Sequence, residues 1–124
     1  MEPLQKKSAE ALFSYFLHDS FISRCRRMLT VEQFRSPGLS SLYTKLYEQA
    51  PLSYQSALFQ QLILAGQIRP ENPDDLALSF YAPILFLLQV CDRQPDREPE
   101  ALQKLASHVH AFHTHYSLQR EESL

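Results

Sequence analysis

Apolar residues recur three and four positions apart along most of the chain, the spacing that places side chains on one face of an α-helix. The clearest example lies between residues 39 and 50, where the apolar positions follow the order i, i+3, i+4 and i+7. Only 2 glycines occur in 124 residues, although strands joined by tight turns usually need more of them. The pattern predicts an all-α protein.

Prolines and capping residues set the expected boundaries of the helices. Ser36-Pro37 and Asn72-Pro73 each place a capping side chain before a proline at the first helical position. Pro51 starts a further helix, and Gly66 falls where a left-handed cap would end it. We therefore expect a six-helix orthogonal or up-down bundle. The approximate helical ranges are 3–18, 20–35, 37–50, 51–65, 73–92 and 99–116.

The fifth expected helix is unusually apolar. From Leu76 to Cys91 its only clearly polar side chains are Ser79 and Gln89, so apolar groups point in every direction around its axis. A helix of this kind must be enclosed on all sides. Pro83 lies in its middle and predicts a bend, because proline removes one backbone hydrogen bond.

Length and charge narrow the class of protein. A chain of 124 residues fits one domain, which we expect to span residues 1–124 and to be ordered from about 3 to 117. The net charge is −2, and the compact basic cluster formed by Arg24, Arg26 and Arg27 is small, so the chain itself is a poor nucleic-acid binder. We expect a cytoplasmic protein with reduced cysteines and no membrane segment, since its longest apolar run is short for a bilayer.

Candidate catalytic chemistry is sparse. The sequence carries no glycine-rich phosphate loop, paired-carboxylate motif or serine elbow, and Cys25 and Cys91 fall within apolar stripes, so we expect neither an enzyme nor a cofactor. His108, His110, His113 and His115 diverge to two sides of the last helix, and no metal site is expected. These histidines border an interface helix whose packing could depend on pH.

Aromatic residues are more informative about function than the histidines or cysteines. The sequence contains 8 phenylalanines, 6 tyrosines and no tryptophan. Several of them lie on helices that would surround a common interior. A packed core explains them, and so does a ligand cavity lined by aromatic rings and a few hydroxyl groups. The pattern leaves both interpretations open.

Four segments carry a resemblance to a known family. They are Met28–Arg35, Ala50–Phe59, the loop Ile68–Pro73, and Phe80–Ile84 followed by Asp92–Pro95. In order and spacing these segments resemble the C-terminal regulatory domain of TetR transcriptional regulators. The resemblance implies a domain that binds an effector, whose last two helices form a four-helix bundle with a second subunit. DNA would be bound only through an N-terminal helix-turn-helix domain, which this sequence does not contain.

The resemblance and the helix faces together give the candidate sites. A small apolar or aromatic effector would contact Phe13, Phe16, Tyr43, Tyr47, Phe59 and Tyr81. The interface of a homodimer would contain Phe80, Ile84, Leu87, Leu88, Leu105, Val109, Phe112 and Tyr116. The alternative is a helical interaction protein without a ligand, which homodimerises or heterodimerises with an intact regulator.

Overall fold

The computed structural model describes residues 2–118, with side chains from Ala9 onward, and this part of the chain is helical with no β-strand. The elements in chain order are α1 (Glu2–His18), α2 (Ser20–Glu32), α3 (Pro37–Thr44), the π-helical turn η1 (Lys45–Gln49), α4 (Ala50–Leu64), α5 (Pro73–Arg93), the 3-10 turn η2 (Pro95–Arg97) and α6 (Glu98–Tyr116). The predicted all-α class is confirmed.

The predicted capping residues begin the helices as expected. Ser36 accepts a hydrogen bond from the backbone of Leu39 at the start of α3, and Asn72 accepts from the first backbone amides of α5. Asp19 caps α2 in the same way. Gly66 adopts a φ of +73°, the left-handed conformation that ends α4. Local sequence thus fixes these boundaries.

The predicted fourth helix begins as expected but is not a separate rod. Pro51 lies in the first turn of α4, yet α3, η1 and α4 follow one another without interruption, so the described residues form five rods and the predicted count of six helices is not confirmed. Ahead of the proline the helix widens, and the amide of Ala50 donates to the carbonyl of Lys45, five residues back. This π-helical turn accommodates the proline without ending the helix.

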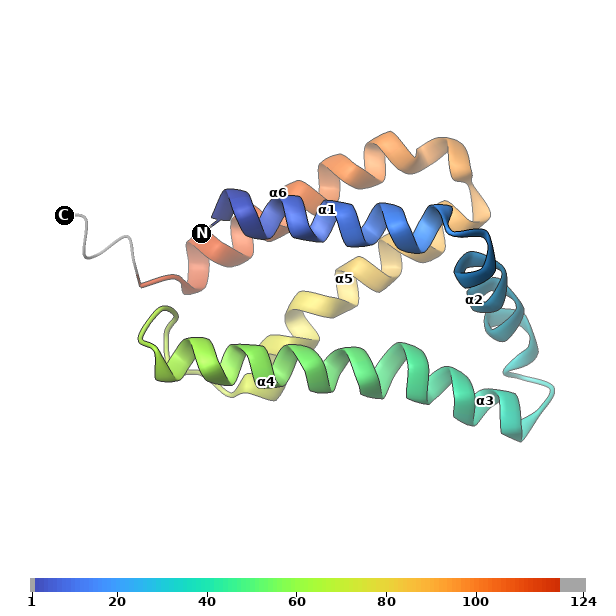
Figure 1. The fold of residues 1–124 in the computed structure, drawn as a ribbon, viewed down its shortest axis with the longest axis horizontal. Helices are drawn as coiled ribbons and strands as arrows, with labels where there is room; N and C mark the ends of the chain where they lie inside the picture. The colour runs from blue at the N-terminus through green and yellow to red at the C-terminus, as the bar shows by residue number, and fades with distance from the viewer. Residues whose placement is uncertain (1, 119–124) are drawn as a thin grey trace.

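The rods lie on two sides of α5 (Figure 1). α1 packs along α6 on one side, and the continuous rod of α3, η1 and α4 runs on the other, where α4 packs along α5. α2 connects the two sides at one end of the molecule. α5 is therefore the helix that joins both halves.

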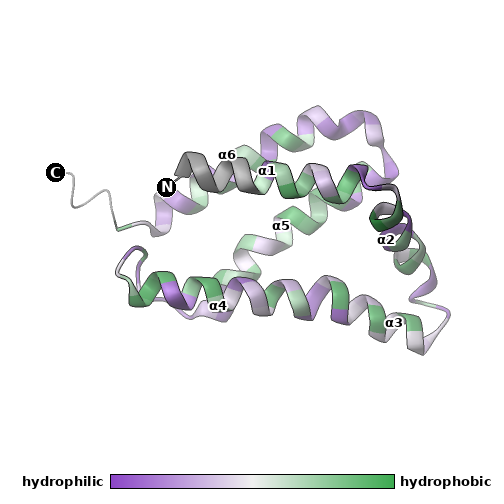
Figure 2. Ribbon diagram, viewed as in Figure 1, coloured by the Kyte–Doolittle hydropathy of each residue, from purple (hydrophilic) through white to green (hydrophobic). Residues whose placement is uncertain are grey.

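The interior consists of two hydrophobic clusters that follow the apolar stripes in Figure 2. The buried members of the first come from α1, α5 and α6: Phe13, Leu87, Leu88, Cys91, Ala101, Leu105 and Val109. The second centres on Phe59 of α4 and on Leu76 and Ala77 of α5. Phe80 packs against both, so it connects the two halves of the core.

The expected enclosure of α5 on all sides is not met within one chain. Leu78 and Phe86 are 56% and 61% exposed, and Ala82 between them is exposed as well. By length and composition α5 could cross a bilayer, a test that core helices also pass, and 33% of its most apolar 18-residue window is buried. In this structure α5 is the central helix of the bundle, with one apolar strip left uncovered.

Candidate functional site

Three of the predicted ligand-binding residues meet between the α3–α4 rod and α5. The rings of Tyr43 and Tyr47 lie 5.1 Å apart, and the hydroxyl of Tyr81 donates to the carbonyl oxygen of Tyr47 at 2.6 Å. The amide nitrogen of Gln89 donates to the hydroxyl of Tyr43 at 3.3 Å. We call Tyr43, Tyr47, Tyr81 and Gln89 the tyrosine cluster.

The hydrogen bond from Tyr81 follows from the proline in the opposite rod. An α-helical residue at position 51 would donate its N–H to the carbonyl four residues earlier, which belongs to Tyr47, but Pro51 has no N–H. The hydroxyl of Tyr81 reaches that carbonyl from α5. A buried carbonyl without a donor is costly, so this contact stabilises the irregular turn and ties it to α5.

The phenol groups of Tyr47 and Tyr81 remain protonated at neutral pH, because burial raises the pKa of each. Burial raises the pKa of Tyr81 far above its ordinary value of 10.0. Burial also raises the pKa of Tyr47, although the positive charge of Arg26 opposes the change. Within the described residues no acceptor contacts the hydroxyl hydrogens of Tyr43 and Tyr47. The cluster therefore offers two donors beside aromatic surface.

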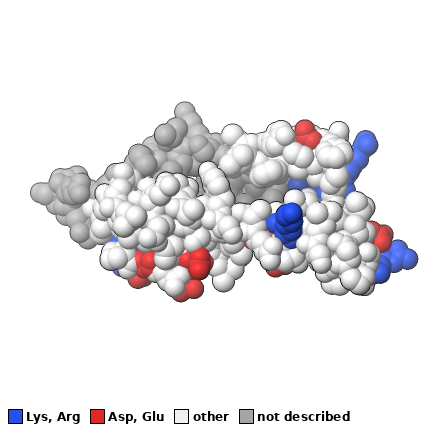
Figure 3. All heavy atoms as spheres, turned by 60° about the horizontal axis from the view of Figure 1, so that its bottom comes forward, with Lys and Arg blue, Asp and Glu red and all other residues white. Residues whose placement is uncertain are grey.

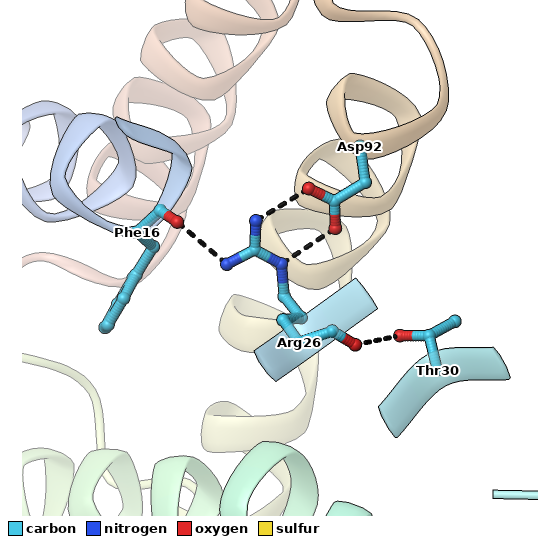
Figure 4. Close-up of polar contacts among 4 residues, drawn as sticks. All are labelled: Phe16, Arg26, Thr30 and Asp92. Atoms are coloured by element: carbon cyan, nitrogen blue, oxygen red, sulfur yellow. Dashed lines mark hydrogen bonds and ion pairs between the residues drawn. The ribbon is translucent and has the colours of Figure 1, made fainter. Parts of the chain in front are cut away.

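A buried ion pair lies beside the tyrosine cluster (Figure 4). Arg26 of α2 is 2% exposed and donates to both carboxylate oxygens of Asp92 on α5, at 2.7 and 2.6 Å. Its third contact, at 2.9 Å, is with the carbonyl oxygen of Phe16 near the end of α1. Burial disfavours the charged guanidinium, but the hydrogen bond and the charge of Asp92 prevail and raise the pKa of Arg26.

Because of this ion pair, Arg26 does not share one exposed basic cluster with Arg24 and Arg27, contrary to what the sequence suggests. Arg24 and Arg27 are exposed, whereas Arg26 points inward and holds α1, α2 and α5 together. Successive residues of a helix are rotated by about 100°, so the side chain of residue 26 points in a different direction from those of residues 24 and 27. Its partner, 66 positions later in the sequence, could not be inferred from a local pattern.

The remaining predicted ligand-binding residues lie elsewhere. Phe13 and Phe59 belong to the two different hydrophobic clusters and are 2% and 6% exposed, so they pack as core. Phe16 is 38% exposed, its ring lies 5.9 Å from that of Tyr15, and its polar contact is made by the backbone. These phenylalanines do not share a site with the tyrosine cluster.

The predicted dimer-interface residues pack inside the single chain. Leu105 is 0% exposed, and Leu87, Leu88 and Val109 are buried in the same cluster. Phe80 and Phe112 contact each other edge to face at 5.0 Å, and Ile84 and Tyr116 are partly buried. A buried side chain has little surface left to contribute to a second subunit, so the packing of one chain gives these buried members no support as interface residues.

His108 makes a specific contact that the sequence did not reveal. Its Nε2 atom lies 2.8 Å from the carbonyl oxygen of Phe80, and its ring stacks on the ring of Phe80 at 5.5 Å. Phe80 follows Ser79, whose carbonyl loses its helical partner at Pro83. In the described part of the chain, no group of three His, Cys, Asp or Glu side chains could hold a metal ion.

A surface groove of about 540 Å³ lies at a different place, between α4 and the start of α5. Its lining mixes polar and apolar surface and consists of Ser53, Ser56, Ala57, Gln60, Asn72, Pro73 and Asp74. Ser56 donates to the carboxylate of Asp74 within it. This groove does not coincide with the tyrosine cluster and lacks the aromatic lining that the sequence suggested.

Comparisons with protein-family models, curated proteins and solved structures find no match to this chain. The resemblance to TetR regulatory domains therefore rests on the sequence segments alone, and function must be argued from the chemistry of the site.

Proposed function

We propose that the chain is a sensing and dimerisation domain of the TetR type, which binds a small, largely apolar molecule at the tyrosine cluster in the cytoplasm. The observation that carries this proposal is the group of buried and partly buried phenols on two proline-containing helical rods. Aromatic surface with a few directed polar groups is typical of small-molecule sites.

The contacts of the cluster indicate what the molecule would be. The partly buried ring of Tyr47 presents aromatic surface beside the buried ring of Tyr43, and both phenol groups can donate to an acceptor. A flat aromatic compound with one hydroxyl or carbonyl oxygen fits this chemistry. A charged group is less suitable, because Arg26 is already neutralised by Asp92.

The same contacts suggest how binding is transmitted. An acceptor on the ligand would compete with the Tyr47 carbonyl for the hydroxyl of Tyr81. Loss of that hydrogen bond would release the π-helical turn from α5, and the two rods could then shift relative to each other. Because α5 also carries the uncovered apolar strip, such a shift would alter that strip.

Dimerisation would use the outer strip of α5, defined by Leu78, Ala82 and Phe86. These residues are four positions apart, exposed and uncharged, so a second copy can pack against them without opposing like charges. Leu78 and Phe86 have roughly half of their surface left to bury, so burial of each against a partner is worth about 1–2 kcal/mol. The strip replaces the buried residues that the sequence assigned to the interface.

A titration by 1H–15N NMR with 2-naphthol as the probe tests the sensing proposal. Amides of residues 43–50, 81–82 and 84–89 should shift, and Tyr47→Ala should weaken binding by about tenfold, a loss of about 1.4 kcal/mol. Tyr54→Phe is the matched control, since Tyr54 is 67% exposed on α4. Shifts confined to other regions, or equal binding by all three proteins, would contradict the proposal.

The alternative function, a helical interaction protein without a ligand, is favoured by a different observation. Large apolar side chains at the end of the molecule formed by α2 and α3 are exposed, with Phe21 at 75% and Phe34 at 85%. A flat NMR response to 2-naphthol would make this alternative the better description.

A further inference from the structure

α2 has its polar and apolar sides partly reversed. Its buried residues include Ser23 and Arg26, while Phe21, Met28 and Val31 are 75%, 47% and 62% exposed. A surface helix normally turns its apolar stripe inward and its charged side chains outward. The exposed apolar side chains of α2 are therefore not explained by the packing of this chain.

The exposed residues follow a regular spacing. Phe21, Arg24, Met28 and Val31 are separated by three, four and three positions, the repeat by which one helix packs along another. They lie on the side of α2 opposite to Arg26 and Leu29, which face the interior. We call these four residues the outer face of α2.

We propose that the outer face of α2 docks an acidic amphipathic α-helix of another protein. The apolar side chains of that helix would pack against Phe21, Met28 and Val31. Its carboxylates would pair with Arg24 and with Arg27 beside it, both of which are exposed. This surface is separate from the tyrosine cluster, so it does not depend on the proposed sensing function.

The residue types of this face favour a protein partner. Phenylalanine, methionine and arginine are enriched in the centres of protein interfaces, where lysine and glutamate are depleted. Arg24 lies within the apolar spacing rather than at its margin. In a lipid bilayer such a placement is expensive, whereas a carboxylate from a protein can meet it with paired hydrogen bonds.

Charge argues for an acidic partner and against a second copy. Two copies of the outer face would bring Arg24 and Arg27 against the same arginines, which is repulsive. In Figure 3 most of the visible Lys and Arg side chains lie in the half of the molecule that contains α2 and α3, with some acidic side chains among them, and the largest acidic group lies in the other half. The acid nearest in sequence, Glu32, already faces Arg35 at 3.5 Å.

The face is held rigidly before any partner arrives. Asp19 caps the first turn of α2, Arg26 anchors its middle to Asp92, and the hydroxyl of Thr30 donates to the carbonyl of Arg26. Leu29 is buried at 2% exposure. A surface that is already ordered loses little conformational freedom on binding, which favours affinity.

A synthetic peptide of about five helical turns provides the probe. It carries leucines at alternating three- and four-residue spacing with glutamates on both flanks, and its control replaces every glutamate by lysine. Fluorescence anisotropy with the full chain should show binding of the glutamate peptide and not of the lysine peptide. Phe21→Ala and Arg24→Glu should each weaken binding about tenfold or more, as expected for interface hot spots.

The matched control is Leu64→Ala, since Leu64 is 77% exposed at the far end of α4. It should bind like the wild-type chain, and equal thermal melting of all variants shows that they fold. No binding of the glutamate peptide, equal binding of the lysine peptide, or no effect of Phe21→Ala would overturn the proposal. Phe21-dependent binding to vesicles of phosphatidylcholine and phosphatidylglycerol without peptide binding would overturn it in favour of a membrane surface.

Discussion

The hydroxyl of Tyr81 donates a 2.6 Å hydrogen bond to the carbonyl of Tyr47, the oxygen that Pro51 cannot supply with an N–H. A related contact joins His108 to Phe80, next to the carbonyl that Pro83 leaves unpaired. At Pro51 a hydroxyl from α5 reaches the carbonyl that lacks its helical donor, whereas at Pro83 a histidine from α6 contacts the adjacent carbonyl. The irregular backbone is thereby tied to tertiary packing.

Removal of the Tyr81 hydroxyl should destabilise the fold. Tyr81→Phe keeps the ring but leaves the Tyr47 carbonyl without this donor, and we expect a loss of about 1–3 kcal/mol in urea unfolding. Tyr54→Phe, at an exposed ring, should change the free energy of unfolding little.

The role of Pro51 can be isolated by a double-mutant cycle. In a Pro51→Ala background the helix can supply its own N–H to Tyr47, so Tyr81→Phe should cost less than it does in the wild-type chain. An equal cost in both backgrounds would show that the hydroxyl does not compensate for the proline.

Disruption of the Arg26–Asp92 pair should be more damaging. Arg26→Met leaves a carboxylate without its partner in a site where the arginine is 2% exposed, and we expect about 3–5 kcal/mol of destabilisation by chemical denaturation. Combining Arg26→Met with Asp92→Leu should recover part of this loss, since no unpaired charge remains. Additive losses in the double variant would contradict the ion-pair explanation.

The two thiols should differ in reactivity. Burial and the nearby carboxylates of Glu98 and Asp92 raise the pKa of Cys91, so little thiolate is present at neutral pH. In a Cys25→Ser variant, Cys91 should react with Ellman's reagent only as the chain unfolds, whereas Cys91→Ser should react without unfolding because Cys25 is partly exposed. Fast reaction of the Cys25→Ser variant would mean that Cys91 is accessible in the folded chain.

Glu100 should contribute to the pH dependence of stability. Hydrogen bonds from Arg97 and Lys104 lower its pKa from 4.5 to about 2. A carboxylate with a lowered pKa stabilises the fold above its ordinary pKa, and this contribution disappears as the pH falls toward 2. Glu100→Gln should melt at a lower temperature than wild type at pH 6, and the difference should vanish near pH 2. A difference independent of pH would exclude this cause, and added salt should reduce it because the site is exposed.

Helix boundaries were predictable because their causes are local. Ser36 and Asn72 cap the starts of α3 and α5 with their side chains, and Gly66 ends α4 through its backbone conformation. Each of them acts within a few residues of its own position. Pro51 marks the first turn of α4 as predicted, but it does not separate α4 from the helix before it, because the effect of the proline depends on what surrounds it. A widened turn and a hydroxyl from α5 allow the helix to continue, and neither is visible in the local sequence.

The site was only partly predictable for a related reason. Periodicity shows which residues share a face of a helix, but it does not show which neighbour covers that face. Leu105 and Val109 were correctly placed on one stripe, yet that stripe meets α1 and α5 of the same chain. Tyr43, Tyr47 and Tyr81 were identified by residue type, while Gln89 and Arg26 came together with them only through tertiary packing.

The uncovered strip of α5 is the feature on which dimerisation depends most. Light scattering at micromolar concentration should give the wild-type chain twice the 14.4 kDa of one copy. Phe86→Glu should give a single-copy mass, because it places a charge within the apolar contact. Leu64→Glu, exposed on another surface, should remain dimeric. A single-copy mass for the wild-type chain, or a dimer that survives Phe86→Glu unchanged, would contradict a dimer formed through α5.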